Sequence, residues 1–315
     1  MSKHFRYRLF DLVLASDLKL DRLLPDESEN APDLFWKCSD FEQETFEATD
    51  QGLLWKTAPD CFELALPNVA TIRVKDGHEI LINLVPDAPM ADVETLLLSA
   101  GVAALMQQRQ VFLLHAAAFE SASGAVLLAG VSGSGKSLLL SALNQRGYPM
   151  ISDDITAISC TKQEAWVHPA WPKVSLMLDA FETLGLDRPE PNLGQAQGKR
   201  TFTATPFCSQ KTPLDKIVFL KWTPEDAISI SNLKGIEALP QLSSNVYRRT
   251  FLKGMQLLES NFTALNQIAA QAQFNTLTRP HDLRRLENVV DKLEEELGII
   301  PSNKTHQSAQ QSAAR

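Results

Sequence analysis

The chain has 315 residues, of which 44% are hydrophobic and 22% are charged, and this near-average composition excludes a chain that is disordered throughout. Its 14 glycines and 17 prolines show no regular spacing, which also excludes a collagen-like or low-complexity architecture. The 30 basic and 38 acidic residues give a net charge of −8, so the chain lacks the electrostatic footprint of a general nucleic-acid binder, although a local basic patch could still occur.

The cysteines and the apolar segments bear on where the protein works. The four cysteines form no CxxC pair, which argues against a zinc cluster and a disulfide framework and indicates a reduced compartment. The first 20 residues lack the apolar core of a signal peptide. The longest apolar-rich stretch, 96–106, is shorter than the ~20 residues of a membrane span. We therefore expect a cytoplasmic protein that has no membrane partner and no nucleic-acid partner.

Residues 1–108 are predicted to form a β-rich N-terminal region that ends in a helix. The apolar runs at 61–66 and 79–85 have the composition of strands. Between them, apolar and polar residues alternate around Asp76-Gly77, which is typical of a hairpin turn. Apolar residues at helical spacing follow from near Ala91.

Residues 109–300 are predicted to form an α/β domain. The apolar runs at 111–119 and 125–130 are typical of buried strands, and a helical pattern at 138–146 stops at Gly147. A strand that begins near Pro149 completes the alternation, which is the pattern of an α/β unit.

The remaining segments of this domain have simpler patterns. Residues 186–213 are rich in Pro, Gly and Gln and are predicted to form a mobile surface loop, whereas 213–222 has the composition of a core strand. Residues 245–297 have a mostly helical pattern that Arg279-Pro280 interrupts, so we expect a helical C-terminal part. The polar residues 301–315 are predicted to be a disordered tail.

The segment from Gly130 to Ser137 matches the full phosphate-binding pattern G-x-x-x-x-G-K-S, known as the P-loop. Its glycines allow backbone N–H groups to surround an anion, and the following helix adds its positive N-terminal end. We expect Lys136 to be an exposed loop cation that contacts the β and γ phosphates, and the Ser137 hydroxyl to bind Mg²⁺. The predicted nucleotide-binding residues are Gly130, Val131, Ser132, Gly133, Ser134, Gly135, Lys136, Ser137 and Leu138.

Two further features could contribute to this site. Asp153 and Asp154 follow the predicted strand, whose carboxyl end would lie at the phosphate edge of the sheet. One of them could bind Mg²⁺ while the other acts as a base, although adjacent acids also occur as solvated turn residues. His115 lies within an apolar run, where a histidine is more often a satisfied core residue than part of a site.

The three segments LLHAAAF, GAVLLAGVSGSGKS and RGYPMISDD together resemble the catalytic domain of HPr kinase/phosphorylase, a bacterial serine kinase built on a P-loop. The match is closer to HPr-kinase-related serine kinases, including those linked to peptide-modification genes. Those proteins share the hairpin at Asp76-Gly77, the helix at 97–109 and a V-H-P segment at Val167. The resemblance spans about residues 5–290 and implies an α/β P-loop kinase domain of HPr-kinase type.

The resemblance also implies a role for each site residue. Lys136 and Ser137 would hold the triphosphate and its metal, Asp153 would be the catalytic base, and Asp154 would support the metal. His115 would lie beside the phosphates. The implied cofactors are ATP and Mg²⁺, and because the HPr-kinase family forms oligomers, a homo-oligomer is one of the states to expect.

The sequence departs from the family in one respect. KVSLMLDAFETLG stands where the family has a glutamate-containing signature, so Asp179 or Glu182 could replace the missing metal ligand. Lys199 and Arg200, within the predicted loop, could close on the phosphates or be solvated loop cations.

The sequence therefore predicts a kinase that transfers the γ-phosphoryl group of ATP to a hydroxyl, most plausibly that of a serine in a protein or peptide acceptor. Two alternatives stay open. One is a kinase for a small molecule, and the other is an ATP-dependent binding or assembly factor without transfer.

Overall fold

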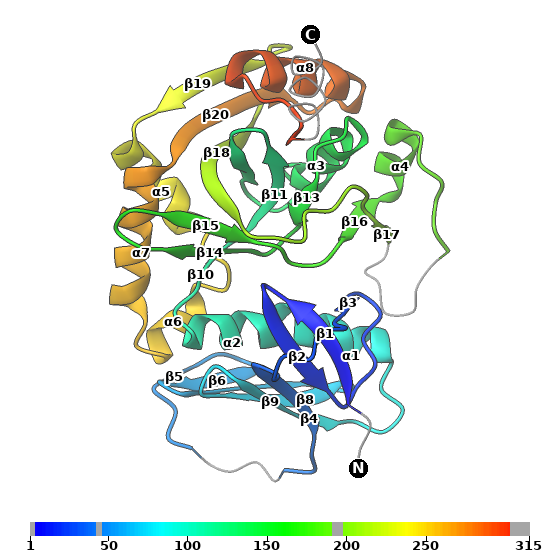
Figure 1. Cartoon of the computed structure of the whole chain (residues 1–315), viewed down its shortest axis with the longest axis vertical. Coiled ribbons are helices and arrows are strands. Elements are labelled where there is room, and N and C mark those ends of the chain that lie inside the picture. Colours follow the sequence, from blue (N-terminus) through cyan, green and yellow to red (C-terminus); the bar gives the residue numbers. More distant parts are fainter. Residues whose placement is uncertain (1–3, 42–45, 191–197, 303–315) are drawn as a thin grey trace. The chain divides into compact units, whose positions relative to one another are not determined.

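The computed structural model describes residues 4–41, 46–190 and 198–302 (Figure 1). Most of the predicted tail at 301–315 therefore lies outside the described residues. The chain divides into two compact units, of which the first holds residues up to Leu113 together with Val246–Ala264. The second holds Leu114–Glu190, Gly198–Asn245 and the residues from Leu265 onward. The sequence assigned residues 246–264 to the second domain, whereas here they pack with the first.

The first unit is built on a nine-stranded sheet in the order β3-β1-β2-β4-β9-β8-β7-β6-β5. Its strands are β1 (Phe5–Leu9), β2 (Leu12–Ser16), β3 (Leu24–Pro25), β4 (Leu34–Cys38), β5 (Asp50–Gln51), β6 (Trp55–Ala58), β7 (Cys61–Leu66), β8 (Ala70–Lys75) and β9 (Glu79–Leu84). The predicted hairpin is confirmed, because Asp76 and Gly77 join β8 to β9 with φ values of 52° and 65°.

A helical stretch over Met90–Gln108 packs on this sheet and confirms the helix predicted from near Ala91. It consists of α1 (Met90–Leu96), a π-helical turn (Leu97–Gly101) and α2 (Val102–Gln108). By length and composition it could cross a membrane, but 72% of its 18-residue apolar window is buried inside the structure, as expected of a core helix. A short helix, α6 (Thr250–Gly254), completes the described part of this unit.

The second unit is a mixed α/β structure, which agrees with the predicted fold class. Its largest sheet contains β11 (Ala116–Ser121), β12 (Gly124–Ala129), β13 (Met150–Ser152), β14 (Thr156–Cys160), β15 (Ala165–His168), β18 (Thr212–Thr223), β19 (Ser229–Leu233) and β20 (Gln273–Pro280). A separate two-stranded sheet pairs β16 (Lys173–Met177) with β17 (Lys199–Thr203). The short β10 (Phe112–Leu114) and the helix α7 (Leu258–Gln271) cross the boundary between the units.

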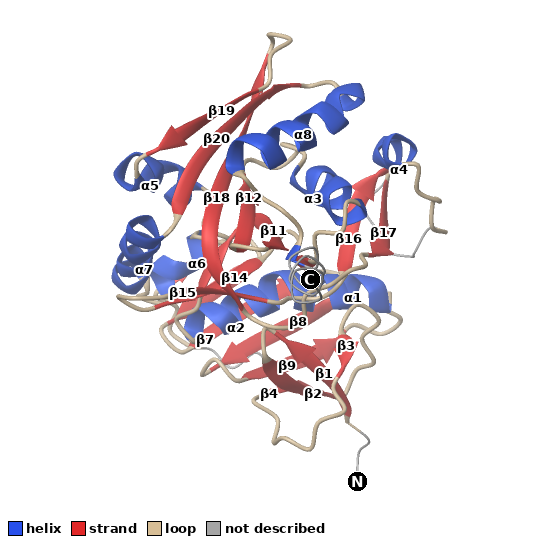
Figure 2. Cartoon of the chain, turned by 45° about the horizontal axis from the view of Figure 1, so that its top comes forward, coloured by secondary structure: helices blue, strands red, loops and turns tan. Residues whose placement is uncertain are grey.

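The strands β12, β18 and β20 are parallel neighbours at the centre of this sheet, and Figure 2 shows them side by side. β13 runs in the same direction as β12, since each is antiparallel to β11 between them. The carboxyl ends of these four strands therefore meet at one edge of the sheet, which is where open α/β sheets bind ligands. The segments that leave this edge include residues 130–135, the two aspartates after Ser152, and His281.

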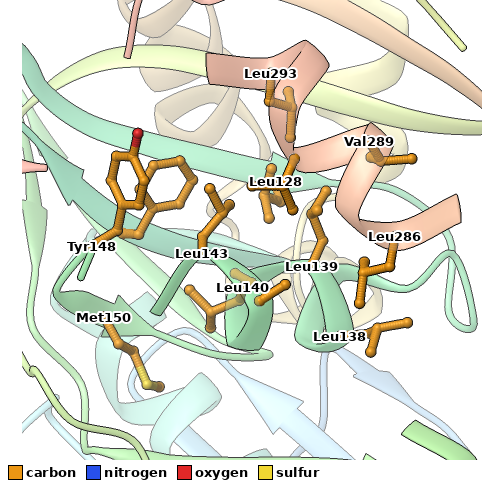
Figure 3. Close-up of a cluster of buried hydrophobic side chains, with 14 of the residues drawn as sticks. Leu128, Leu138, Leu139, Leu140, Leu143, Tyr148, Met150, Leu286, Val289 and Leu293 are labelled. Carbon is orange, nitrogen blue, oxygen red and sulfur yellow. The ribbon is translucent and has the colours of Figure 1, made fainter. Parts of the chain in front are cut away.

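Four helices complete the second unit: α3 (Lys136–Gln145), α4 (Leu178–Leu184), α5 (Gly235–Ser244) and α8 (Leu286–Leu297). Leucines of α3, among them Leu139 and Leu143, pack with Leu286 and Val289 of α8 in one buried cluster (Figure 3). This burial fixes α3, and with it the loop that precedes α3, against the sheet.

Two predictions for this unit are wrong. Residues 273–280 form the strand β20 rather than the end of a helical region, because they pair with β18 on one side and β19 on the other. Lys199 and Arg200 lie in β17, paired with β16, rather than in a mobile loop. The rest of that predicted loop includes residues 191–197, which lie outside the described residues.

Candidate functional site

The glycine-rich loop at residues 130–135 connects β12 directly to α3. Gly133 and Gly135 adopt φ values of 82° and 84°, in the left-handed region that favours glycine. The backbone N–H groups at the start of α3 have no acceptor within the helix, so this end of α3 can bind an anion. The strand, loop and helix thus occur in the order that the sequence motif requires.

The side chain of Lys136 is buried, which corrects the expectation of an exposed loop cation. The residue is only 6% exposed, and its Nζ donates hydrogen bonds to the carbonyl oxygens of Gly130 (2.8 Å) and Val131 (3.1 Å). This burial lowers the pKa of the Lys136 ammonium, while the nearby aspartates act in the opposite direction.

His115 connects Lys136 to one of the two aspartates. Its Nε2 lies 3.0 Å from Nζ of Lys136, and its Nδ1 lies 3.2 Å from Oδ1 of Asp154 and 3.1 Å from the carbonyl oxygen of Asp154. A neutral imidazole with its proton on Nδ1 satisfies both neighbours, since Nδ1 then donates and Nε2 accepts. The structure thus brings His115 together with two of the predicted site residues.

The two aspartates have opposite environments. Asp153 is 8% exposed, and its Oδ1 accepts a hydrogen bond of 2.8 Å from the Ser137 hydroxyl. Burial, and next the negative charge of Asp154, raise the pKa of Asp153 to about 6. Burial acts to raise the pKa of Asp154 too, but the hydrogen bond from His115 and the nearby positive charges lower it overall. The pair therefore contains one carboxyl that titrates near neutrality and one that stays ionised.

A cavity of about 340 Å³ lies beside the loop, which is enough for a small ligand. Six of the nine predicted nucleotide-binding residues line it: Ser132, Gly133, Gly135, Lys136, Ser137 and Leu138. His115 and Asp154 also line it, whereas Gly130, Val131, Ser134 and Asp153 do not.

The other residues that the sequence suggested for the site also fall into those that line the cavity and those that do not. Asp179 and Lys199 line the cavity. Glu182 does not, and it forms an ion pair with Arg188. Arg200 is likewise absent from the lining. Of the two acids that the sequence suggested as an additional metal ligand, the structure therefore places only Asp179 beside the cavity.

The residues present suit a magnesium ion that is held together with a phosphate ligand. Among the described residues, no group of three or more His, Cys, Asp or Glu side chains is placed to hold a metal without further ligands. The Ser137 hydroxyl and the Asp153 carboxylate are nevertheless in contact, and both are hard oxygen donors of the kind that Mg²⁺ prefers. Mg²⁺ sites of this kind usually take their remaining ligands from phosphate oxygens and water.

Among the residues that border the cavity and that sequence reasoning did not assign to the site are Trp222, Arg279 and His281. Trp222 lies near the end of β18, and Arg279 lies opposite it in β20. The sequence treated Arg279 only as part of a helix interruption. Recognising residues 273–280 as a strand parallel to β12 would have placed Arg279 at the same edge as the glycine-rich loop.

Comparison with known proteins gives a limited result. No family model matches the chain, and no curated protein matches it. Solved structures do match, among them the HPr(Ser) kinase/phosphatase from Coxiella burnetii, which is 14% identical in sequence. That match covers 59% of this chain and 98% of the other, with a TM-score of 0.30. The similarity is low, and the function proposed below rests on the geometry of the site itself.

Proposed function

We propose that the protein is an ATP-dependent kinase that transfers the γ-phosphoryl group to a hydroxyl, with the serine of a protein or peptide as the acceptor. One observation carries the proposal: Lys136 and residues of the glycine-rich loop line one cavity, and the Ser137 hydroxyl, which also lines it, is bonded to the buried Asp153, whose pKa is raised. Phosphoryl transfer depends mainly on positioning and on neutralising charge, and these groups supply both functions.

Each residue has a proposed role. The loop amides and Lys136 bind the phosphates, and Ser137 would hold a Mg²⁺ ion, which would supply positive charge to offset that of the phosphates. Asp153 accepts the proton of the acceptor hydroxyl, because a carboxyl with a pKa of about 6 is better matched to that task than an ordinary aspartate. Asp154, which stays ionised, supports the metal and orients His115.

A different observation favours the opposite division of roles. Asp153 contacts Ser137, the hydroxyl that would bind Mg²⁺, whereas Asp154 borders the cavity that an acceptor would enter. In that arrangement Asp153 would support the metal and Asp154 would face the acceptor. Comparing the two asparagine variants, as described in the Discussion, distinguishes the two assignments.

The proposal extends to where the protein works and in what form. We propose a cytoplasmic location, because the sequence has only four cysteines and no CxxC pair. We also propose that copies of the chain associate into a homo-oligomer, which light scattering of the purified protein would test.

The test of the function is transfer of labelled γ-phosphate from Mg²⁺-ATP to serine-containing peptides and to a metabolite extract. Label on a peptide serine supports the proposal, whereas label on a metabolite alone indicates the small-molecule kinase. Tight ATP binding with no transfer to either acceptor indicates the binding or assembly factor. The Lys136→Met variant should lose transfer. Lys221→Met, which changes an exposed lysine of the same unit, should retain it.

A further inference from the structure

One part of the cavity wall differs in chemistry from the loop and the acids. It is formed by Trp222, His281 and Leu283, which offer two aromatic rings and an aliphatic side chain. The rings of Trp222 and His281 are in contact, with centroids 4.5 Å apart and planes at 50°. Trp222 is the last residue but one of β18, and His281 directly follows β20. Because β20 is parallel to β18 and β18 is parallel to β12, both residues lie at the edge where the glycine-rich loop begins.

Arg279 joins this aromatic wall to the glycine-rich loop. It is 1% exposed, and its Nη2 donates a hydrogen bond of 2.9 Å to the carbonyl oxygen of Ser134. The carbon of its guanidinium lies 4.3 Å from the centre of the Trp222 ring. A Cβ atom at Gly135 would lie only 2.3 Å from the same Nη2, so the loop and Arg279 are packed in direct contact.

The charge of Arg279 also points to a ligand. Within the described residues Arg279 forms no ion pair, and its buried Nε has no hydrogen-bond partner. A desolvated guanidinium without an acidic partner is costly, and an anion bound in the adjoining loop would offset that cost. Burial lowers the pKa of Arg279 to about 10, so the group remains charged at neutral pH.

From these contacts we infer that Trp222 and His281 form the subsite for the base of a nucleoside triphosphate whose phosphates lie in the glycine-rich loop. The inference rests on the proposed function, because it places the phosphates in that loop. The two rings provide a π-surface that a heteroaromatic base can pack against. Arg279 fixes this surface relative to the loop, and its charge favours the triphosphate. The site would therefore select a nucleotide over a bare polyphosphate.

The experiment compares the affinity of the full chain for ATP and for inorganic tripolyphosphate by calorimetry, both in Mg²⁺. The parent should bind ATP more tightly than tripolyphosphate. Removing one aromatic partner with Trp222→Ala or His281→Ala should weaken ATP binding by about 5- to 150-fold, the range for one base–aromatic stack. Both variants should leave the affinity for tripolyphosphate within about twofold of the parent, and Trp222→Phe should restore most of the ATP affinity.

The controls separate this inference from the proposed function. His281 is exposed, so His281→Ala tests the subsite even where Trp222→Ala fails to fold. Equal affinity of the parent for ATP and tripolyphosphate overturns the base subsite and leaves the phosphate site intact. Unchanged ATP affinity in both His281→Ala and Trp222→Ala, or a parallel loss for both ligands, also overturns it. A parent that binds neither ligand contradicts the proposed function itself, and the subsite falls with it.

Discussion

The Nζ atom of Lys136 lies 3.0 Å from Nε2 of His115, although 21 positions separate the two residues in the sequence. The other nitrogen of the same ring faces Asp154. The imidazole therefore links the first residue of α3 to the segment that follows β13. A substitution at any of these three positions should affect the other two.

Lys136→Met should abolish phosphoryl transfer and also destabilise the protein. The ammonium satisfies two loop carbonyls, and leaving buried polar groups unpaired costs about 1–3 kcal/mol. Urea unfolding and a transfer assay measure the two effects. Lys221→Met is the matched control and should change neither. Full transfer by Lys136→Met would contradict the kinase proposal.

The two aspartates should differ when each is changed to asparagine. If Asp153 is the base, Asp153→Asn should keep its affinity for Mg²⁺-ATP and lose transfer by a factor of about 10²–10⁴, the usual contribution of general acid–base catalysis. Asp154→Asn should instead weaken Mg²⁺-dependent binding, with partial recovery at high Mg²⁺. The reverse pattern would assign the base to Asp154, and the absence of any change in either variant would remove both residues from the mechanism.

The raised pKa of Asp153 predicts how stability depends on pH. An aspartate carboxyl in the unfolded chain has an ordinary pKa of 3.8, and burial raises the pKa of this one to about 6, so the folded state binds more protons between these values. The contribution of Asp153 to stability should therefore fall as pH rises from about 4 to about 6, by roughly 1–3 kcal/mol. Thermal unfolding of the parent and of Asp153→Asn should be measured at pH 4 and at pH 7. The difference in stability between the two proteins at each pH gives the contribution of Asp153. A difference that does not change with pH would contradict the raised pKa.

Gly135→Ala should be more costly than Gly133→Ala, although the two glycines have nearly the same φ. A Cβ atom at Gly135 would meet Nη2 of Arg279 at 2.3 Å, whereas nothing lies within 4 Å of a Cβ atom at Gly133. Both substitutions place alanine at a positive φ, so both variants carry a similar backbone strain. The difference between their free energies of unfolding therefore measures the contact with Arg279. Overpacking of this kind typically costs about 1–3 kcal/mol, which chemical denaturation can resolve. Equal stability of the two variants would show that Arg279 moves aside freely.

Lys199 and Arg200 are neighbours in β17, but only Lys199 lines the cavity. Lys199→Met should weaken ATP binding by about two- to fivefold, the size expected of an exposed charge interaction, and Arg200→Met should have no effect. The loss should shrink as salt concentration rises, because ions screen exposed charges. Equal effects of the two variants would indicate that the cavity does not distinguish these side chains.

The parts of the structure that follow from local pattern could be predicted from the sequence. The hairpin at Asp76-Gly77 and the strand–loop–helix around Gly130 each depend on residues close together in the chain, and both are present. The strand β20 could not be predicted in this way, because its stability comes from pairing with β18 and β19 rather than from its own periodicity. In the sequence β20 lies between the helices α7 and α8, and the helical pattern on both sides led to a helical prediction for β20 as well.

The burial of Lys136 was missed for a related reason. A motif specifies which residue types are present, but the hydrogen bonds to Gly130 and Val131 depend on how the loop closes over the side chain. The same holds for Arg279, whose place beside Ser134 depends on the order of strands in the sheet. The sequence therefore predicted several of the residues that line the cavity, and it missed Arg279, which contacts the loop beside them.

The hydrogen bond between Arg279 and Ser134 joins residues 145 positions apart, and this separation bears on synthesis of the protein. A ribosome completes the glycine-rich loop long before it makes β20, so the nascent chain holds the whole motif while the carbonyl oxygen of Ser134 still lacks its partner. Contacts between such distant parts of a chain form late and slowly in folding. The loop should therefore reach its final shape, and gain its proposed affinity for a nucleotide, only after β20 has been made.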